Sequence, residues 1–384
     1  MLFSCHFDEM HGEEKSANAL FMFISPIDFS SQLQCSSVEM TTKTSACHLE
    51  PSRLWRRWER SGGTHMNAYK IIKYMNIKDF KQNKPLAEFT SYKIGGPAKY
   101  FYCAETSDSA VEAITLARKE NIPYVILSGG TNLLISDKGF DGLVVRMEND
   151  QLTIEGTKVT AEAATSMAVM ASKTVTAGLT GFEWGVGIPG KVGGAIYGNA
   201  GCFGKDIAAS LKRVRVLYEQ EDVVWMDASK CQFGYRDSLF KKHKEWIILE
   251  AEFELEKGDP SEGRKKIKEY VYYRTEKQPH GTATAGSTFT NPNVDTISDE
   301  LKKEAEELGI VRNNTVPAGW LIDKTSLKGK QIGGVKVSKK HANFFENTGN
   351  GTAEEMMQLM SFVKQQVRDE LGVQLHEEVQ LLGF

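Results

Sequence analysis

The stretch "GVGIPGKVGGAIYGNAGCFG", residues 185 to 204, is the key to the fold because eight of its twenty residues are glycine. Two nucleotide-binding patterns match it. Residues 185–190 satisfy G-x-G-x-x-G, the fingerprint of a Rossmann dinucleotide fold, and residues 185–191 satisfy G-x-x-x-x-G-K, the phosphate-binding P-loop. Each pattern requires a particular structural context, so the neighbouring residues decide whether it applies.

Neither context is present. A Rossmann fingerprint opens a helix, but five more glycines follow Gly190 in this stretch, and each disfavours a helix by about 1 kcal/mol relative to alanine. A P-loop needs Ser or Thr after its lysine, where this chain has Val192, and Pro189 removes an amide from the loop. Two interpretations remain: close approach of backbone amides to phosphate oxygens, or tight packing between domains.

A second loop rich in small residues, "SGGTNLL" at 128–134, follows the apolar run "YVIL". Before it, "SDSAVEAITLARKENI" predicts a helix capped by Ser107 or Asp108. This order predicts a strand–helix–strand start, with the loop at the carboxyl end of a strand, where ligands tend to bind. Two amide-rich loops of this kind could flank the pyrophosphate of a dinucleotide.

The remainder of the chain has mixed strands and segregated helices, which indicates an α+β fold rather than one doubly wound sheet. The predicted helices lie at 165–181, ending at Gly178 or Gly181, and at 261–274, 297–309 and 352–372. The last has Thr352 and Glu355 as a capping box and Gly372 as its stop. The predicted strands lie at 98–105, 212–219, 222–227, 245–256 and 375–383.

Composition excludes several classes of protein. The 384 residues are 41% hydrophobic and 25% charged with a net charge of -3, which argues against nucleic acid as the main partner. No apolar run approaches the roughly 18 residues of a membrane span. The six cysteines form no C-x-x-C and the histidines no H-E-x-x-H, so no metal site is expected. In a chain of this length, the scattered cysteines indicate reduced thiols of a cytoplasmic protein.

Residues 1–65 lack sustained periodicity, and their polar composition predicts disorder rather than a targeting peptide. The residues "RSGGTHM" at 60–66 can be encoded by purine-rich codons that resemble a ribosome-binding site ahead of an ATG. We therefore expect translation to start naturally at Met66. A peptide from residues 1–59 in the mass spectrum of the native protein would contradict this.

Eight motifs in register give the chain a resemblance to the UDP-N-acetylenolpyruvoylglucosamine reductases. They are "TSYKIGGPA" (90–98), "SGGTNLL" (128–134), "GIPGKVGGAIYGNAGCFG" (187–204), "FGYRDS" (233–238), "KQP" with "AGSTFTNP" (277–292), "PAGWLID" (317–323), "GGVKVSKKHANF" (333–344) and "LHEEVQLLG" (375–383). The resemblance covers nearly all of 75–384 and none of 1–65. The short stretch from Arg236 to Ser287 is similar to the subset of the family that lacks a substrate-capping insertion.

The resemblance implies an FAD-binding fold of the vanillyl-alcohol-oxidase-like type, followed by a C-terminal substrate domain. We expect FAD-binding subdomain 1 at 66–134, joined by the strand at 373–384, and FAD-binding subdomain 2 at 135–272. The substrate domain is expected at 273–372. The family reaction is NADPH-dependent, FAD-mediated reduction of UDP-N-acetylglucosamine enolpyruvate to UDP-N-acetylmuramate in peptidoglycan precursor synthesis. A cytoplasmic monomer that acts on a UDP-sugar, without a nucleic-acid or membrane partner, is expected.

Three residues match the catalytic positions of the family. Arg236 in "FGYRDS" matches the arginine that stabilises the enolate-like intermediate, because its planar fork suits a carboxylate. Ser287 in "AGSTFTNP" matches the proton donor, and it lacks the glycines of a G-x-S-x-G nucleophile elbow. Glu378 matches the glutamate that helps stabilise the intermediate. Strand alternation puts Glu377 on the opposite face, so only one of the two can point at the substrate.

The remaining site predictions concern binding. For substrate they are Lys277, Asn291 and His341, and the histidine could equally be a packed loop residue. Phe203 stands where the family often has Tyr. No histidine neighbours the 128–134 loop, so FAD is expected to bind non-covalently, with NADPH as co-substrate. The cofactor-binding predictions are Ser128, Gly129, Gly130, Thr131, Asn132, Leu133, Gly187, Gly190, Gly193 and Gly194.

Three other functions remain possible interpretations of the sequence. Another FAD-dependent sugar or alcohol oxidoreductase of the same fold is the main alternative, although an oxidase needs no proton donor for a carbanion. A P-loop nucleotide-binding module is opposed by Val192. A non-catalytic binding protein could keep the fold without the chemistry. The colour of the purified protein separates the flavin readings from the others.

Overall fold

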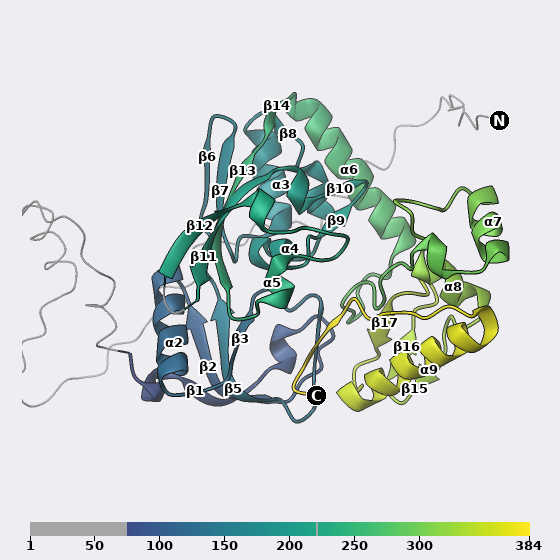
Figure 1. Ribbon diagram of the computed structural model, residues 1–384, viewed down its shortest axis with the longest axis horizontal. Coiled ribbons are helices and arrows are strands. Elements are labelled where there is room, and N and C mark those ends of the chain that lie inside the picture. Colours follow the sequence, from purple (N-terminus) through teal and green to yellow (C-terminus); the bar gives the residue numbers. More distant parts are fainter. Residues whose placement is uncertain (1–74, 220–221) are drawn as a thin grey trace, which may run out of the picture. The chain divides into compact units, whose positions relative to one another are not determined.

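The computed structural model describes residues 75–219 and 222–384 (Figure 1). The leader predicted for residues 1–65 and the start predicted at Met66 lie outside these ranges. The described residues all belong to a single unit. Its described part contains helices and both parallel and antiparallel sheets, so the predicted α+β class is confirmed.

The first sheet has four strands in the order β1-β2-β5-β3. Strands β2 and β3 both run parallel to β5, and β1 runs antiparallel to β2. Since β5 lies between β2 and β3, this sheet extends beyond the subdomain boundary predicted at residue 134. The strand bounds are β1 (Lys81–Pro85), β2 (Pro97–Ala104), β3 (Tyr124–Leu127) and β5 (Phe140–Met147).

Helix α2 (Ser107–Lys119) covers one face of this sheet. Its small and branched residues Ala110, Ala113 and Ile114 are fully buried in one core with Leu143 and Val145 of β5. The cap is Thr106, not Ser107 or Asp108 as the sequence suggested. Thr106 is still extended (φ -133°, ψ 158°), and its side chain accepts the backbone N–H of Ser109. Two short 3₁₀ helices, η3 (Ile77–Asp79) and η4 (Ala87–Phe89), flank β1.

The second sheet has five antiparallel strands in the order β12-β11-β13-β7-β6. One of its faces packs on α3 (Met167–Thr176) and on the glycine-rich segment, in a core that includes Trp184 and Phe253. Gly178, which was predicted to stop α3, has φ +77° two residues beyond its end. The strand bounds are β6 (Leu152–Glu155), β7 (Lys158–Glu162), β11 (Leu211–Tyr218), β12 (Asp222–Asp227) and β13 (Ile247–Glu254).

The glycine-rich segment contains a helix that its composition argued against. Helix α4 (Val192–Tyr197) forms because protein groups satisfy its first amides: Val192 N–H bonds the carbonyl of Thr165, and Gly193 N–H bonds that of Ala163. What precedes α4 is the 3₁₀ helix η5 (Glu183–Gly187) rather than a strand, so the Rossmann context is still missing.

Further elements lie between the strands of this sheet in chain order, and two of them follow it toward the C-terminal part. Helix α6 (Pro260–Lys277) is the longest of them, and Asp259 caps it by accepting the N–H of Ser261 at 2.7 Å. The others are β8 (Leu179–Thr180), β9 (Gly201–Cys202), β10 (Lys205–Asp206), η6 (Ile207–Ala209), η7 (Ala228–Lys230), α5 (Leu239–Lys242) and β14 (Glu256–Lys257).

The C-terminal part has a small sheet of its own, in the order β15-β16-β17. Helix α9 (Ala353–Leu371) packs its apolar face into the same core as Val335 and Phe345. The predicted capping box of Thr352 and Glu355 is present, and Gly372 ends the helix with φ +68°. The remaining bounds are η8 (Val294–Thr296), α7 (Asp299–Glu307), α8 (Ala318–Lys324), β15 (Gln331–Ile332), β16 (Val335–Val337) and β17 (Phe345–Asn347).

The final strand returns to an early part of the chain. Strand β18 (Gln380–Leu382) pairs in parallel with β4 (Leu133–Ile135), which begins at the end of the 128–134 loop. It is shorter than the predicted strand at 375–383. A second link is electrostatic: both carboxylate oxygens of Asp137 accept amides of the first turn of α9, from Ala353 at 2.9 Å and Glu354 at 3.1 Å.

The described residues lack two kinds of feature. Between Met75 and Phe384, leaving out 220–221, no helix combines the length and apolar character needed to cross a membrane. Over the same residues, no three His, Cys, Asp or Glu side chains gather as metal ligands would.

Candidate functional site

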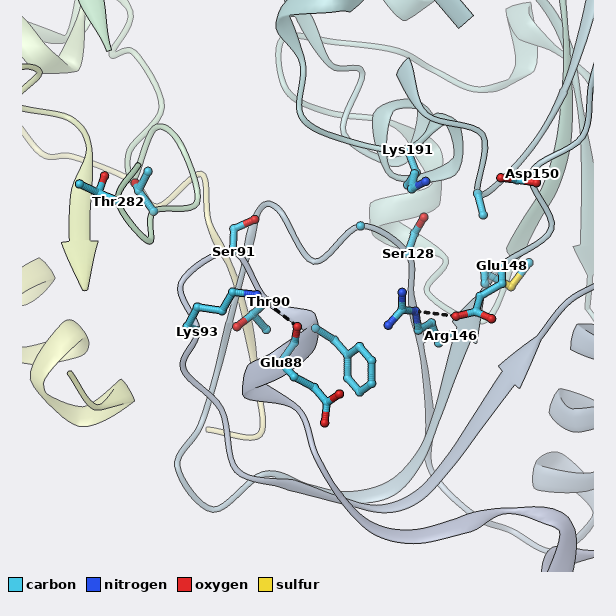
Figure 2. A pocket seen from close by; sticks show the side chains of 15 residues that line it. Glu88, Thr90, Ser91, Lys93, Ser128, Arg146, Glu148, Asp150, Lys191 and Thr282 are labelled. Atoms are coloured by element: carbon cyan, nitrogen blue, oxygen red, sulfur yellow. Dashed lines mark hydrogen bonds and ion pairs between the residues drawn. The ribbon is translucent and has the colours of Figure 1, made fainter. Parts of the chain in front are cut away.

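A pocket of about 660 Å³ lies beside the 128–134 loop (Figure 2). Ser128 and Gly129 line it from that loop, Lys191 from the start of α4, and Thr282 and Thr284 from the segment before Ser287. Its volume lies within the range of roughly 300–1,000 Å³ that is usual for ligand and cofactor sites. Segments distant in the sequence therefore supply polar groups to one pocket.

Two buried hydroxyls in this pocket lack a partner. The Oγ of Ser128 and the Oγ1 of Thr284 are shielded from solvent, and neither has a hydrogen bond within the described part of the chain. A buried hydroxyl without a partner costs free energy, so a ligand rich in acceptors fits here. With the ammonium of Lys191 at the same wall, these residues fit the phosphate and ribityl oxygens of FAD.

The two glycine-bearing loops lie against each other at this pocket. A Cβ built on Gly129 would lie 3.8 Å from the Cα of Gly190 and 3.4 Å from the Cγ of Lys191, and one on Gly190 would lie 3.6 Å from the Oγ1 of Thr131. Backbone at both loops can therefore approach a ligand closely.

The other predicted cofactor glycines have different surroundings. A Cβ on Gly130, which has φ +58°, would overlap the carbonyl of Phe89, and one on Gly187 would lie 2.9 Å from the Cδ of Arg274. Gly193 faces Ala163 across 3.1 Å. Local packing therefore explains these three glycines. Gly194 has open space around it.

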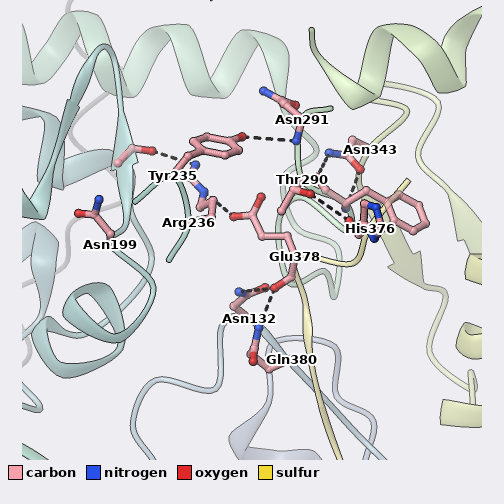
Figure 3. Close-up of polar contacts among 12 residues, drawn as sticks. Asn132, Asn199, Tyr235, Arg236, Thr290, Asn291, Asn343, His376, Glu378 and Gln380 are labelled. Carbon is pink, nitrogen blue, oxygen red and sulfur yellow. Dashed lines mark hydrogen bonds and ion pairs between the residues drawn. The ribbon is translucent and has the colours of Figure 1, made fainter. Parts of the chain in front are cut away.

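Asn132 and Leu133 join the 128–134 loop to the segment that carries Glu378. The side-chain amide of Asn132 donates to the backbone carbonyl of Glu378 at 3.0 Å. The backbone carbonyl of Asn132 accepts the N–H of Gln380, also at 3.0 Å (Figure 3). Leu133 begins β4 and pairs with Gln380. The backbone position of Glu378 therefore depends on the loop that borders the pocket.

Arg236 lies in a tight turn. Gly234 and Asp237 exchange backbone hydrogen bonds of 3.0 and 3.3 Å, which leaves Tyr235 and Arg236 as the two central residues. Arg236 has φ +55°, a left-handed conformation that costs a non-glycine residue on the order of 1–3 kcal/mol. The side chain of Asn199 holds the turn by donating to the carbonyl of Gly234 at 2.9 Å. Such strain persists only where the surroundings enforce it.

The turn directs Arg236 at Glu378. The guanidinium Nε donates to the Oε1 of Glu378 at 2.7 Å, and Nη2 donates to the carbonyl of Gly201 at 3.0 Å (Figure 3). Nη1 has no partner among residues 75–219 and 222–384. An arginine held at two of its nitrogens and open at the third can bind a further carboxylate without reorganising.

Burial shapes the charge of this ion pair. The Glu378 side chain keeps only 17% of its surface exposed, and burial raises the pKa of its carboxyl above the ordinary value while Arg236 opposes that rise. Burial alone would lower the pKa of Arg236, but the carboxylate of Glu378 raises it instead. Glu377, its neighbour, pairs with Lys364 of α9 at 2.6 Å. The two glutamates therefore have different partners, although both precede β18 and the predicted strand does not extend over them.

Ser287 lies on a segment paired with the one that carries Glu378. Its backbone bridges to Phe344, and the next residue, Thr288, accepts the N–H of Glu378 at 2.8 Å. The Ser287 side chain is partly exposed, and its hydroxyl has no hydrogen bond within the described residues. The hydroxyl caps no turn in this structure and is free to bond a ligand.

The predicted substrate residues lie in three different settings. The backbone N–H of Asn291 donates to the hydroxyl oxygen of Tyr235 at 3.4 Å, and the side-chain oxygen of Asn291 accepts the N–H of Ala318 at the start of α8. His341 is partly buried, and its Nδ1 accepts the N–H of Asn343 at 3.3 Å. Its ring also lies close to Gly319 of α8, so it is a packed loop residue as well as a candidate for substrate binding. Lys277 is exposed at the end of α6.

Sequence reasoning missed several residues of the site. Lys191 was considered only as a P-loop lysine and was set aside with that motif. Asn199 and Lys241, whose ammonium donates to the carbonyl of Arg236, surround the turn without any local signal. Thr284 had a signal, since it stands in the run of small residues just before Ser287.

Phe203, at the position where the family often has Tyr, stacks on Tyr270 of α6 with ring centroids 4.1 Å apart. The ring thus has a packing partner of its own. Phe203 also has φ +53°. No hydroxyl contact is available from this side chain.

Comparison with known proteins gives matches in both halves of the chain. A family model for the UDP-N-acetylenolpyruvoylglucosamine reductase C-terminal domain matches residues 278–382, and one for an FAD binding domain matches residues 98–227. The reductase of Caldanaerobacter subterraneus subsp. tengcongensis is 38% identical over 302 residues, covering 78% of this chain and 93% of that protein. The Bacillus subtilis reductase is 33% identical over 314 residues, covering 81% and 97%.

A solved structure is also similar. The crystal structure of UDP-N-acetylenolpyruvylglucosamine reductase from Thermus caldophilus has a TM-score of 0.63 at 27% sequence identity, and the match covers 79% of this chain and 99% of that one. The similarity therefore runs through both the FAD-binding part and the C-terminal part.

Proposed function

This chain belongs to the UDP-N-acetylenolpyruvoylglucosamine reductase family, and on that premise we propose that it reduces UDP-N-acetylglucosamine enolpyruvate to UDP-N-acetylmuramate. NADPH is the proposed source of the hydride and FAD the proposed cofactor. The observation that carries the proposal is the Arg236–Glu378 pair of 2.7 Å, which leaves one guanidinium nitrogen open for the carboxylate of an enolpyruvyl group.

The cofactor site of the proposal is the pocket beside the 128–134 loop. Ser128, Thr284 and Lys191 would hold FAD oxygens, with backbone of Gly129 and Gly190 close by. FAD held there would supply the redox chemistry, which is transfer of a hydride from NADPH to the terminal carbon of the enolpyruvyl double bond. None of the residues that line the pocket is a histidine or a cysteine, which supports non-covalent attachment.

The residues of the chain handle the charge and the proton. As hydride adds to the terminal carbon, negative charge moves toward the carboxylate, and Arg236 would stabilise it through its open nitrogen. Glu378 orients that guanidinium. The carbon next to the carboxylate then takes a proton, which we assign to the free hydroxyl of Ser287. The net change is NADPH and one proton consumed, NADP⁺ released and the double bond saturated.

The proposed substrate contacts are less direct. Lys277, exposed on α6, could reach a diphosphate, while the backbone of Asn291 and the ring of His341 flank the segment that carries Ser287. We further propose that the protein works as a cytoplasmic monomer in peptidoglycan precursor synthesis, since NADPH and the UDP-sugar are water-soluble metabolites. A net charge of -3 is consistent with a role that does not involve nucleic acid.

One experiment tests the function as a whole. The purified protein should be yellow, with a flavin absorbance spectrum. NADPH should bleach it, and the enolpyruvyl sugar nucleotide should restore the colour under anaerobic conditions, with UDP-N-acetylmuramate as the product. A colourless protein, or a reduced flavin that the substrate leaves reduced, would contradict the proposal.

A further inference from the structure

The backbone carbonyl of Arg236 has a cation bound to it. Lys241, on the four-residue helix α5, donates its ammonium to this carbonyl from five residues further along the chain. The lysine side chain is partly buried, and within the described ranges it forms no ion pair with a carboxylate. A partly buried lysine normally pairs with a carboxylate, so its hydrogen bond to a backbone carbonyl needs an explanation.

The reason lies in the conformation of the residue it contacts. Arg236 is the left-handed position of the turn closed by Gly234 and Asp237. Asn199 fixes the entry to this turn through the carbonyl of Gly234, and Lys241 fixes its exit through the carbonyl of Arg236. The two contacts restrain the peptide group that enters the turn, between Gly234 and Tyr235, and the one that directly follows Arg236.

The surrounding charges agree with this arrangement. Burial lowers the pKa of Lys241, and the nearby carboxylates of Asp237 and Glu378 oppose that effect. The ammonium therefore lies close enough to Glu378 to favour its ionised form, which in turn holds the Nε of Arg236. The lysine thus acts on both ends of the ion pair.

We propose that Lys241 is a positioning residue that holds Arg236 in its left-handed turn, so that the guanidinium meets the substrate carboxylate. This inference rests on the proposed function, and it concerns a residue that would itself touch neither substrate nor cofactor. It predicts a loss confined to ligands that carry the carboxylate.

The test compares two sugar nucleotides binding to the oxidised protein in the absence of NADPH. Isothermal titration calorimetry should show that Lys241→Met lowers the affinity for the enolpyruvyl sugar nucleotide about ten- to a hundredfold, which is the usual contribution of a charged hydrogen bond. Affinity for UDP-N-acetylglucosamine, which lacks the carboxylate, should stay within about twofold. Lys242→Met is the matched control, because that neighbour on α5 is exposed, and it should change neither.

A second variant separates positioning from packing. Lys241→Ala should regain part of its carboxylate-specific affinity when ethylammonium is added, because a small cation can bond the Arg236 carbonyl. Equal losses for both nucleotides in Lys241→Met, or full affinity for both, would overturn the inference. If the unmodified protein binds neither nucleotide, the proposed function fails first. If the unmodified protein binds both nucleotides and Lys241→Met binds each with the same affinity as the unmodified protein, only the proposed role of Lys241 is refuted.

Discussion

The carbonyl oxygen of Thr288 accepts the backbone N–H of Glu378 at 2.8 Å, which pairs the segment of the proposed proton donor with that of the proposed catalytic glutamate. This backbone bond does not depend on the Ser287 side chain. A change of that side chain should therefore leave the pairing, and the site around it, in place.

Ser287→Ala should therefore fold, bind FAD and be reduced by NADPH at close to the normal rate. Return of the flavin colour with the enolpyruvyl substrate should slow about 10²–10⁴-fold, the usual contribution of a positioned acid. Stopped-flow absorbance of the flavin measures both half-reactions.

Two further variants complete this test. Ser287→Cys should recover part of the rate because a thiol is acidic and about the right length. Ser172→Ala, at an exposed serine of α3, should behave as the unmodified protein. If the colour of Ser287→Ala returns at the normal rate, another group supplies the proton.

Arg236→Lys should separate the half-reactions in a similar way. Lysine keeps the charge but loses the planar fork, so it cannot hold Glu378 through one nitrogen and a substrate carboxylate through another. We expect the rate of flavin reoxidation by the enolpyruvyl substrate to fall about thirty- to a hundredfold, while the rate of flavin reduction by NADPH stays nearly normal.

The matched control is Arg264→Lys on the exposed face of α6, which should alter neither step. Equal slowing of both half-reactions in Arg236→Lys would mean that the arginine serves the flavin or the fold.

Valine at Gly193 and at Gly194 should have different effects. A Cβ on Gly193 meets the Cβ of Ala163 at 3.1 Å, so Gly193→Val should lower the free energy of unfolding by about 1–3 kcal/mol. A Cβ on Gly194 meets nothing within 4 Å, so Gly194→Val should fold normally.

The flavin content of Gly194→Val then decides whether this helix turn borders the cofactor. We expect weaker FAD retention after gel filtration, with an unchanged melting temperature of the FAD-free protein. A variant that keeps its full flavin content would remove Gly194 from the cofactor site, and packing would suffice to explain this part of the glycine-rich segment.

His341 should make stability depend on pH. Burial, reinforced by Lys328, lowers the pKa of His341, whereas in the unfolded chain it should be near the ordinary value of about 6.5. Between these two values the unfolded chain holds more protons. The stability that the neutral ring contributes is therefore present above about pH 6.5 and is lost as the pH falls through the folded pKa.

His341→Asn should remove this dependence, because the asparagine oxygen can replace Nδ1 in accepting the N–H of Asn343. The difference in melting temperature between the unmodified protein and the variant should shrink from pH 8 to pH 5. Lys328→Gln should make the loss smaller, because the folded-state pKa of His341 would then lie closer to its unfolded value. A difference that is constant over the whole range would show that the ring titrates as freely in the folded protein as in the unfolded one.

Local signals predicted much of the fold. The capping box of Thr352 and Glu355 and the stop at Gly372 were predicted for α9 because they act within a few residues. The failures have tertiary causes. Helix α4 forms despite its glycines because Thr165 and Ala163 accept its first amides, and β5 belongs to the first sheet because it pairs with β2 and β3. Neither partner is visible in the local sequence.

The candidate site divides in the same way. The resemblance supplied Arg236, Ser287 and Glu378 as residue types in order along the chain. It could not supply the left-handed φ of Arg236, which depends on Asn199 and Lys241, or the unpartnered hydroxyl of Thr284. These features arise from contacts between segments that a linear motif does not relate.

The parallel pairing of β18 with β4 has a consequence for biosynthesis. Asn132 and its partner Glu378 are 246 positions apart, and ribosomes add roughly 5–20 residues per second, so on the order of ten to fifty seconds separate their synthesis. During that time β4 has no β18 to pair with and Arg236 has no Glu378. A nascent chain could thus complete its five-stranded sheet before the proposed catalytic glutamate exists, and a premature stop codon just before Glu378 should abolish the proposed activity.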